Sequence, residues 1–446
     1  MAYDYDLVVI GAGSGGLAAA KRAAQYDAKV AIVEREQLGG VCVNRGCVPK
    51  KLMVYASDFA HLMQAAKDYG WQVELGQFHW QEFVQKRDRE LERLRQVQAK
   101  ALAEANVTIL RGHASFHDDH TLMVDDRKVS ARHILIAVGS QPVKPPIPGI
   151  EHTITSREMF HLPQPPERLA IIGGGYIGVE FASMMQAFGS NVTILNVEEC
   201  ILANFDQDLS STLRDALLER GIQSLCNTTA KQIQPTDNGL QLSLSGKSES
   251  FTADVVLCAT GRRPQLEHLE LDRAGIELDG KAIAVDGYCR TSQPHIFAIG
   301  DCIARLPLTP VANAEGRAAA DTLFGDRPRQ VRYDLVPTAV FARPEAASVG
   351  MTEASAREKL GDQAVQCSCQ QFRPLFDTLT QSPTKTLIKW VMHRESKQIL
   401  GCHIVGKHAA EIIQGVGLAM QKGITQADLE AMIPIHPSSA EELFGS

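Results

Sequence analysis

Two copies of one glycine-rich pattern restrict this chain to an α/β architecture. The first copy follows an apolar run, Tyr5 to Ile10, and reads Gly11-Ala12-Gly13-Ser14-Gly15-Gly16, before an alanine-rich segment and a second apolar run that ends at Glu34. In this fingerprint Gly11 permits a tight turn, Gly13 lets a pyrophosphate approach, Gly16 packs helix against strand, and the acid binds ribose hydroxyls. The first 34 residues therefore predict a dinucleotide site.

The second copy begins after the apolar run Leu169 to Ile172 and reads Gly173-Gly174-Gly175-Tyr176-Ile177-Gly178. A predicted helix over Val179 to Phe188 and a strand over Asn191 to Leu195 follow, and Asn196 takes the position of the acid. Each copy also closes with an apolar run and a small-residue turn, at Gly139 and at Gly261. Because the order of elements recurs, we interpret the two segments as an internal repeat with two dinucleotide sites.

Size and charge narrow the protein class further. A chain of 446 residues exceeds one ordinary core, and its 44% hydrophobic content with 35 glycines suits a globular α/β protein of two to four domains. The net charge of −7 argues against a nucleic-acid surface. The first strand begins near the initiator Met, and no apolar run reaches membrane-spanning length, so we expect a cytoplasmic protein with no membrane segment.

Two cysteines, Cys42 and Cys47, are separated by four residues just after the first glycine loop and its acid. We expect Cys42 in a loop and Cys47 at the start of a helix over Val48 to Met63, where the helix terminus favours a thiolate. Such a pair can close a small disulfide ring, and in a reducing compartment a disulfide is typically catalytic. Two buried structural cysteines or half of a zinc site are the alternatives, although no second ligand pair follows nearby.

Together these residues resemble the pyridine nucleotide-disulfide oxidoreductases over almost the whole chain. The segment Gly39 to Lys51 and the C-terminal segment His436 to Glu442 are similar to the glutathione reductase branch. The resemblance implies FAD at the first glycine loop, NADH or NADPH at the second, a homodimer and no metal. It also implies two Rossmann-like domains and a C-terminal α+β domain, divided into an FAD-binding part at 1–141, an NAD(P)-binding domain at 142–262, a central segment at 263–331 that completes the FAD domain, and a dimerisation domain at 332–446.

The same resemblance implies an electron path. Electrons pass from the nicotinamide through the flavin to the Cys42–Cys47 disulfide, where Cys47 faces the flavin and Cys42 attacks the external disulfide. His436, oriented by Glu441 and contributed by the other subunit, would protonate the leaving thiolate. Small-disulfide reduction is therefore the expected activity.

Further roles are implied for residues around both cofactors. Lys50 would stabilise the reduced flavin and pair with Glu180, and Tyr176 would cover the nicotinamide pocket. The implied FAD contacts are Gly11, Gly13, Ser14, Gly15, Gly16, Glu34, Gly40, Cys42, Lys50, Gly139, Asp301 and Thr309. The implied nicotinamide-coenzyme contacts are Gly173, Gly175, Tyr176, Ile177, Gly178, Glu180, Asn196 and Gly261. The implied substrate contacts are Ser14, Lys21, His436 and Glu441.

The segment after Leu195 departs from the branch. NADPH-dependent members usually carry two basic residues there to bind the 2′-phosphate, and Val197 and Ala203 stand in their place. Glu198 would repel a phosphate that carries a charge near about −2. We therefore expect NADH to be preferred, although Asn196 is a weaker ribose acceptor than a carboxylate.

The disulfide pocket departs from the branch as well. Lys21 keeps a positive charge where the branch usually has arginine, but Gln98 and Thr322 stand where it typically has tyrosine and arginine. Glutathione disulfide is the leading substrate, because Lys21 remains as a positive charge that can bind one of its carboxylates. Glutathione amide reductase and dihydrolipoamide dehydrogenase are the alternative enzymes, and a flavin-binding diaphorase with incidental cysteines is the alternative from another class.

Overall fold

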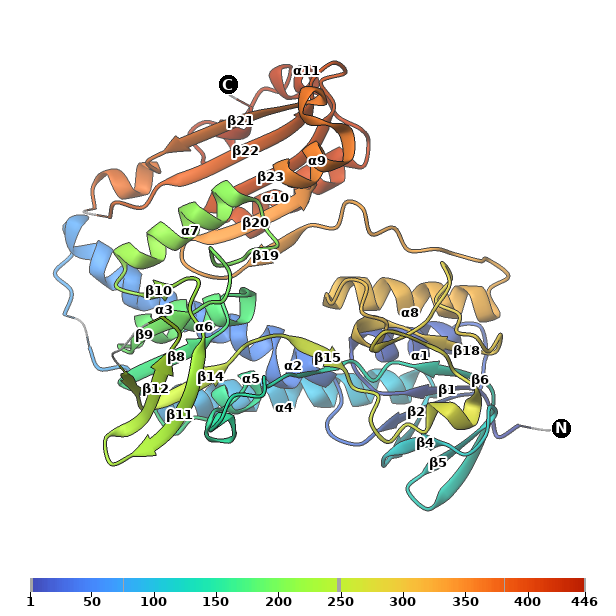
Figure 1. Ribbon diagram of the computed structural model, residues 1–446. Coiled ribbons are helices and arrows are strands. Elements are labelled where there is room, and N and C mark those ends of the chain that lie inside the picture. The colour runs from blue at the N-terminus through green and yellow to red at the C-terminus, as the bar shows by residue number, and fades with distance from the viewer. Residues whose placement is uncertain (1–2, 75, 247–249, 381, 445–446) are drawn as a thin grey trace. The chain divides into compact units, whose positions relative to one another are not determined.

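The computed structural model describes residues 3–74, 76–246, 250–380 and 382–444, and the chain separates into two compact units (Figure 1). The first unit consists of Met1–Leu52, Gln81–Val143 and Gly261–Tyr333. The second consists of Met53–Trp80, Lys144–Thr260 and Asp334–Ser446. The chain therefore passes repeatedly between the units, and each unit is assembled from three stretches.

A seven-stranded sheet forms the centre of the first unit. Its parallel strands are β1 (Tyr5–Ile10), β2 (Val30–Glu34), β3 (Thr108–Arg111), β6 (Arg127–Ile136) and β18 (Ile296–Ala298). Two antiparallel strands, β4 (Ala114–Phe116) and β5 (Thr121–Val124), extend it beyond β6. The side chains of β1 and β2 are almost completely buried, which explains why both strands read as continuous apolar runs.

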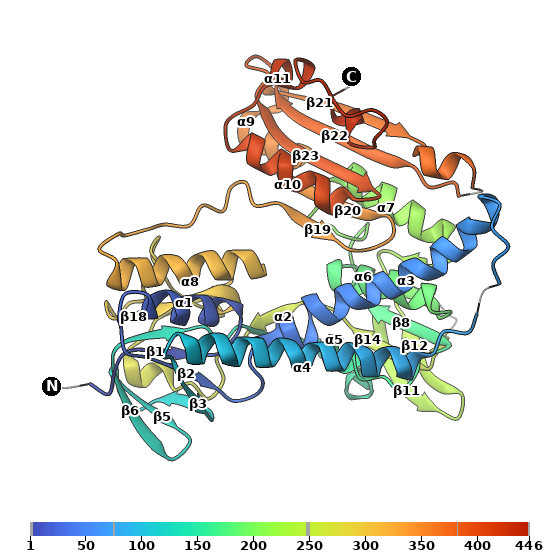
Figure 2. The same ribbon diagram turned by 180° about the vertical axis from the view of Figure 1, so that it is seen from behind.

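Helices α1 (Ser14–Ala24) and α8 (Thr309–Phe324) pack against each other in this unit and lie side by side in both views (Figures 1 and 2). Small residues allow the close approach, since a Cβ on Gly316 would lie 2.4 Å from the carbonyl oxygen of Gly15. Three further helices follow β2 in the chain, namely α2 (Gly40–Arg45), α3 (Cys47–Asp68) and α4 (Trp80–Glu104).

The second unit contains a four-stranded parallel sheet in the order β10-β9-β8-β14. Its strands are β8 (Arg168–Ile172), β9 (Asn191–Leu195), β10 (Gln223–Leu225) and β14 (Val255–Cys258). Helix α6 (Tyr176–Ala187) follows β8, and α7 (Gln207–Glu219) follows β9. An antiparallel sheet of β11 (Ala230–Thr236), β12 (Gly239–Leu244) and β13 (Phe251–Ala253) precedes β14 in the chain.

The C-terminal part of the second unit is a five-stranded antiparallel sheet in the order β19-β20-β23-β22-β21. Its strands are β19 (Thr338–Val340), β20 (Glu345–Gly350), β21 (Val365–Phe372), β22 (Thr386–His393) and β23 (Ile399–Gly406). Helix α10 (Ala409–Met420) packs on this sheet, as Figure 2 shows, and α9 (Glu353–Leu360) and α11 (Gln426–Glu430) complete this part. The predicted fold class is confirmed by the two sheets that are built around parallel strands and by this α+β segment.

The two glycine-rich turns have the same geometry. Gly11 has φ +102° and Gly173 has φ +118°, and a Cβ on them would lie 2.5 Å from the Ala137 carbonyl oxygen and 2.4 Å from that of Ala259. Only glycine suits such a left-handed, crowded position. Helix α6 begins at Tyr176, three residues before the predicted Val179, and α1 likewise begins inside its glycine motif, at Ser14, because the last residues of each motif already belong to the first helical turn.

The remaining strands form two short antiparallel pairs. Strand β7 (Ser140–Pro142) pairs with β15 (Arg262–Pro264), and β16 (Leu278–Asp279) pairs with β17 (Ala282–Ile283). A four-residue helix, α5 (Ser156–Met159), starts at a capping box. Within the described ranges, no helix combines the length and the apolar character that crossing a membrane requires.

Candidate functional site

The first glycine turn and its acid form a cradle in the first unit. The Glu34 carboxylate accepts hydrogen bonds from the backbone N–H groups of Ala12 (2.8 Å) and Glu36 (2.7 Å), so the carboxylate is fixed beside the turn. Gly40, the first residue of α2, approaches so closely that a Cβ on it would lie 2.7 Å from the Cα of Gly13. The cradle therefore leaves backbone exposed where a side chain would intrude, and it fits the FAD that the sequence implies.

The two redox cysteines lie on consecutive helices. Cys47 is the first residue of α3, as predicted, but Cys42 lies inside the short helix α2 and not in a loop. The prediction was wrong because Gly39, with φ +98°, permits the chain to turn directly into a helix at Gly40. In this structure both are thiols, hydrogen-bonded to one another.

The hydrogen bond between the two thiols separates their acidities. The Cys42 thiol donates to Cys47, and this bond, with the hydroxyl of Thr309 and the positive charge of Lys50, lowers the pKa of Cys47 to about 6. The Sγ of Cys47 and the Oγ1 of Thr309 are 3.5 Å apart. The same bond to Cys47, reinforced by burial, raises the pKa of Cys42. Cys47 is therefore the thiolate of the reduced pair, and Cys42 must lose its proton before it can attack a disulfide.

A second cluster in the first unit surrounds Asp301, the second residue of the turn Gly300–Ile303 after β18. The hydroxyl of Ser140 donates to the Asp301 carboxylate. The Arg262 guanidinium donates to the Ser140 hydroxyl at 2.9 Å and to the Ser140 carbonyl oxygen at 2.7 Å. Sequence reasoning identified Asp301 but missed Ser140 and Arg262, whose only signal was that each follows a small-residue turn at Gly139 or Gly261.

Arg45, between the two cysteines in sequence, forms an ion pair with Glu36. The neighbouring Asn44 donates from its side-chain amide to the carbonyl oxygens of Leu38 and Gly40, at 3.0 and 2.9 Å. These contacts attach the redox helix α2 to the segment that carries Glu34. The guanidinium of Arg45 is therefore bound to a carboxylate, rather than extended into solvent as a free charge.

The second glycine turn, in the second unit, is closed by Asn196. Its Oδ1 accepts the backbone N–H of Gly174 at 3.2 Å, and its Nδ2 donates to the carbonyl oxygen of Cys200 at 2.8 Å. Tyr176, the first residue of α6, keeps 43% of its surface exposed. Glu180 is buried in the same helix and accepts the backbone N–H of Phe341 at 2.8 Å. The pairing of Glu180 with Lys50 stays a prediction.

The C-terminal candidates, His436 and Glu441, are brought together. The Nδ1 of His436 lies 2.8 Å from a carboxylate oxygen of Glu441, and the other carboxylate oxygen accepts the backbone N–H of Ser438 at 3.1 Å. The hydrogen bond from His436 lowers the pKa of Glu441. The His436 side chain is 82% exposed, so the carboxylate orients an imidazole that remains accessible.

The other predicted residues lie at the ends or along the sides of the same elements. Ser14 begins α1 and hydrogen-bonds to Cys42, Thr309 begins α8, and Lys21 is half-buried near the end of α1. Of the two substituted pocket positions, Gln98 lies on α4, and the Thr322 hydroxyl donates to the carbonyl oxygen of Ala318 within α8. Gly13 precedes α1, Gly175 precedes α6, and Gly15, Gly16, Ile177 and Gly178 form first-turn positions of these helices.

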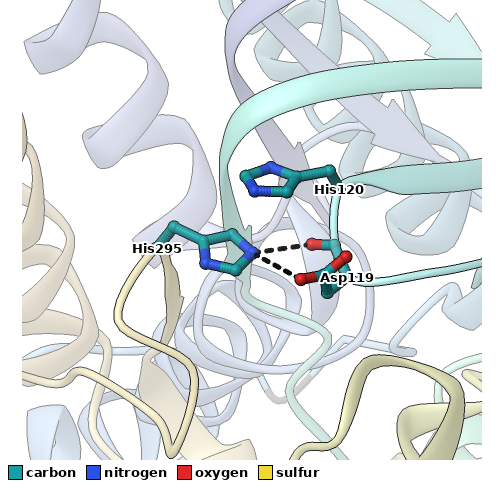
Figure 3. Close-up of side chains that lie close together, drawn as sticks. All are labelled: Asp119, His120 and His295. Carbon is teal, nitrogen blue, oxygen red and sulfur yellow. Dashed lines mark hydrogen bonds and ion pairs between the residues drawn. The ribbon is translucent and has the colours of Figure 1, made fainter.

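A histidine cluster lies elsewhere in the first unit (Figure 3). The Nε2 of His295 is 2.9 Å from the carbonyl oxygen of Asp119 and 3.8 Å from its carboxylate, and His120 stacks on His295 with ring centroids 3.9 Å apart. A metal ion must lie in the plane of each imidazole that binds it. Because the planes are only 15° from parallel, they do not converge on one ion, and we assign no metal to this cluster.

Comparison with known proteins agrees with this geometry. Residues 5–316 match the family model "Pyridine nucleotide-disulphide oxidoreductase", and residues 336–444 match the dimerisation domain of that family. A glutathione reductase of Nostoc sp. is 47% identical, with 99% of both chains covered. One of Burkholderia cepacia is 42% identical, covering 99% of this chain and 98% of the relative, and a chloroplastic/mitochondrial one of Pisum sativum is 38% identical, covering 99% and 82%.

These matches span both units and both glycine repeats. The family uses FAD and a pyridine nucleotide, and the first glycine cradle with its adjacent cysteine pair fits this use. The protein is thus an NAD(P)H-dependent disulfide oxidoreductase. It belongs to the pyridine nucleotide-disulphide oxidoreductases, in the glutathione reductase branch.

Proposed function

We propose that this enzyme reduces glutathione disulfide, passing electrons from a nicotinamide coenzyme through FAD to the Cys42–Cys47 pair. The observation that carries the proposal is the hydrogen-bonded pair itself, with a low pKa at Cys47 and a raised pKa at Cys42. The curated relatives that share 37–47% identity with this chain bear the name glutathione reductase. Rapid oxidation of the coenzyme with glutathione disulfide as acceptor is the expected result.

Each residue of the pair has a separate task. Bound FAD would accept hydride from the nicotinamide and deliver two electrons to the protein disulfide. Cys47, held as a thiolate by Cys42, Thr309 and Lys50, would stay next to the cofactor. Cys42 would lose its proton and attack one sulfur of the substrate, which joins one glutathione to Cys42 and releases the other as a thiolate. Attack by Cys47 on Cys42 then releases the second glutathione and restores the disulfide.

The leaving thiolate requires a proton, and His436 is the proposed donor. Glu441 binds its Nδ1, which leaves Nε2 directed away from the carboxylate. Two large apolar side chains just before His436 in the chain are exposed, Ile433 by 90% and Ile435 by 81%. Since such exposure is typical of a surface that a partner covers, we propose a homodimer in which His436 serves the redox pair of the other copy.

Replacing His436 with glutamine tests this assignment. Glutamine can still hydrogen-bond to Glu441 but cannot deliver a proton, so we expect kcat with glutathione disulfide to fall about 10²- to 10⁴-fold. His152→Gln is the matched control, because His152 is also a surface histidine beside a glutamate, Glu151. Steady-state kinetics of both variants suffice. A His436→Gln enzyme with unchanged kcat would exclude the proposed proton donor.

NADH is the coenzyme that we propose, from the loop that follows β9. Residues 196–206 contain no lysine, arginine or histidine, and Val197, Glu198 and Ala203 are all exposed. The side chain of Asn196 is already used, because it accepts a hydrogen bond from Gly174 of the glycine turn and donates one to Cys200 of the loop. A 2′-phosphate would therefore meet carboxylates and no positive charge in this loop, whereas the ribose hydroxyls of NADH meet no such repulsion.

The rates with NADH and NADPH provide the test. We expect kcat/KM to be at least about tenfold higher with NADH, since one unfavourable charge contact costs about 1.4 kcal/mol or more. Val197→Arg should improve kcat/KM for NADPH by adding a phosphate-binding charge. Leu218→Arg, which adds the same charge at a similarly exposed position on α7, should not. A tenfold preference of the unmodified enzyme for NADPH would contradict the proposal.

The choice among disulfides rests on Lys21, Gln98 and Thr322. Lys21 offers one positive charge, while the hydroxyl of Thr322 is used inside its own helix. We therefore place glutathione disulfide first and glutathione amide disulfide second, because the amide needs fewer carboxylate anchors. Comparing the two disulfides and lipoamide as acceptors would rank them. The cytoplasmic location stays a prediction from the sequence.

A further inference from the structure

Glu315 is a buried carboxylate that none of the preceding roles uses. It lies in the second turn of α8, and only 1% of its surface is exposed. One carboxylate oxygen accepts the backbone N–H of Gly300 at 2.7 Å, and the other accepts the hydroxyl of Tyr333 at 2.8 Å. Burying a carboxylate costs free energy, and hydrogen bonds to its oxygens offset that cost. The groups that donate these bonds therefore show which parts of the fold Glu315 holds in position.

The first partner, Gly300, immediately precedes Asp301. Gly300 has φ +73° and begins the turn Gly300–Ile303, in which Asp301 is the expected FAD ligand. The Asp301 side chain is held by Ser140, but its backbone direction depends on the Gly300 amide. Glu315 therefore fixes the backbone from which the ligand projects.

The second partner, Tyr333, connects the carboxylate to a positive charge. Its hydroxyl oxygen accepts from Arg305 at 3.2 Å, and the same guanidinium donates to the carbonyl oxygen of Asp286 at 2.7 Å. The chain Arg305–Tyr333–Glu315–Gly300 is thus hydrogen-bonded from end to end within the first unit. Such a network holds its members more firmly than isolated bonds do.

We propose that Glu315 is a positioning residue for FAD, acting through Gly300 on the orientation of Asp301. The inference rests on the proposed role of Asp301 as a flavin ligand. Helix α8 also begins with Thr309, which lies beside the Cys47 thiol. One helix therefore holds both the flavin-binding turn and the proposed flavin-facing thiol, so a change at Glu315 affects where the cofactor lies relative to that thiol.

Titration of the flavin-free protein with FAD tests the proposal. We expect Glu315→Gln to raise the FAD dissociation constant about 10- to 100-fold, because an amide cannot accept from both donors and the charge of the acceptor is lost. Tyr333→Phe removes only one of the two bonds and should raise the constant about three- to tenfold. Quenching of flavin fluorescence reports binding directly and needs no disulfide substrate, so a wrong assignment of glutathione disulfide would leave this measurement unaffected.

Asp321→Asn is the matched control. Asp321 lies on the same helix, is 7% exposed, and accepts from Arg22 at 2.5 Å and from Tyr26 at 2.8 Å, away from Gly300. Its substitution should lower the thermal midpoint without changing FAD affinity. An unchanged FAD dissociation constant in both Glu315→Gln and Tyr333→Phe would overturn the proposal. An equal loss of affinity in Asp321→Asn would also overturn it, because Glu315 would then only support the fold.

Discussion

Replacement of Cys42 with serine should abolish reduction of glutathione disulfide, with a fall in kcat of more than about 10⁴-fold. Serine can neither form a disulfide with Cys47 nor attack the substrate sulfur, so electrons would stop at the flavin. The thiol of Cys42 also donates the hydrogen bond that gives Cys47 its low pKa. Coenzyme oxidation with each acceptor, measured on the purified flavoprotein, gives the result directly.

Quinone reduction by the same variant discriminates between the two classes of function. Because a quinone can take electrons from the flavin without the cysteines, this activity should persist in Cys42→Ser. Cys369→Ser is the control, since Cys369 is an exposed cysteine on β21. If Cys42→Ser still reduced glutathione disulfide at the original rate, the cysteines would be incidental and the protein would be a diaphorase.

The parts of the fold that could be predicted are those that local sequence dictates. Gly11 and Gly173 have positive φ, and each faces a carbonyl oxygen that would clash with a side chain. Because only glycine suits these positions, the glycine pattern in the sequence was enough to predict both dinucleotide turns. Glu34 was equally predictable, because it ends a buried strand beside its own turn. The cysteine pair was recognised for the same reason, as Cys42 and Cys47 are only five positions apart.

The parts that escaped prediction depend on contacts between distant segments. Ser140 meets Asp301 across 161 positions, and Glu315 meets Gly300 because α8 packs back against the turn that follows β18, while Tyr333 reaches Glu315 from beyond the end of α8. No local pattern marks such partners, since a serine after a turn or a glutamate in a helix is ordinary. Arg45 shows a local limit as well, because its position between the cysteines gave no sign that Glu36, nine positions earlier, would bind it.

A deeply buried ionic cluster in the second unit was missed for that reason too. Lys389 on β22 is 2% exposed, and its ammonium lies 3.0 Å from Asp206, 2.6 Å from Asp208 and 2.7 Å from Glu353. Asp206 is 1% exposed, caps α7 and accepts the backbone N–H of Glu353 at 3.1 Å. In the sequence Lys389 is a charged residue inside an apolar strand, and only the folded second unit shows three carboxylates around it.

Lys389→Met should destabilise the enzyme by about 3 kcal/mol, the lower end of the range for removing one partner of a buried ion pair. The lower end applies because Asp208 and Glu353 are 48% and 30% exposed and can be hydrated, whereas Asp206 would stay buried without the ammonium group that now lies beside it. A domain of about 150–250 residues loses about 2–4 °C in thermal midpoint per kcal/mol, so the thermal midpoint of the second unit, which holds this cluster, should fall by about 6–12 °C. Lys385→Met, at an exposed position just before β22, should leave the midpoint unchanged.

The loss should also depend on pH. The hydrogen bond from Lys389 lowers the pKa of Glu353 to about 2. Burial raises the pKa of Asp206, but the backbone N–H of Glu353 and the charges of His403 and Lys389 outweigh burial, so the pKa of Asp206 is lowered as well. Carboxylates with lowered pKa values stabilise the fold above their unfolded pKa of about 4, and this contribution is lost as the pH falls through the folded values. The difference between Lys389→Met and the unmodified enzyme should therefore be largest near pH 7 and shrink below about pH 4. Thermal midpoints measured across this range would contradict the electrostatic account if the difference stayed constant, because lost packing of the lysine stem would give a loss independent of pH.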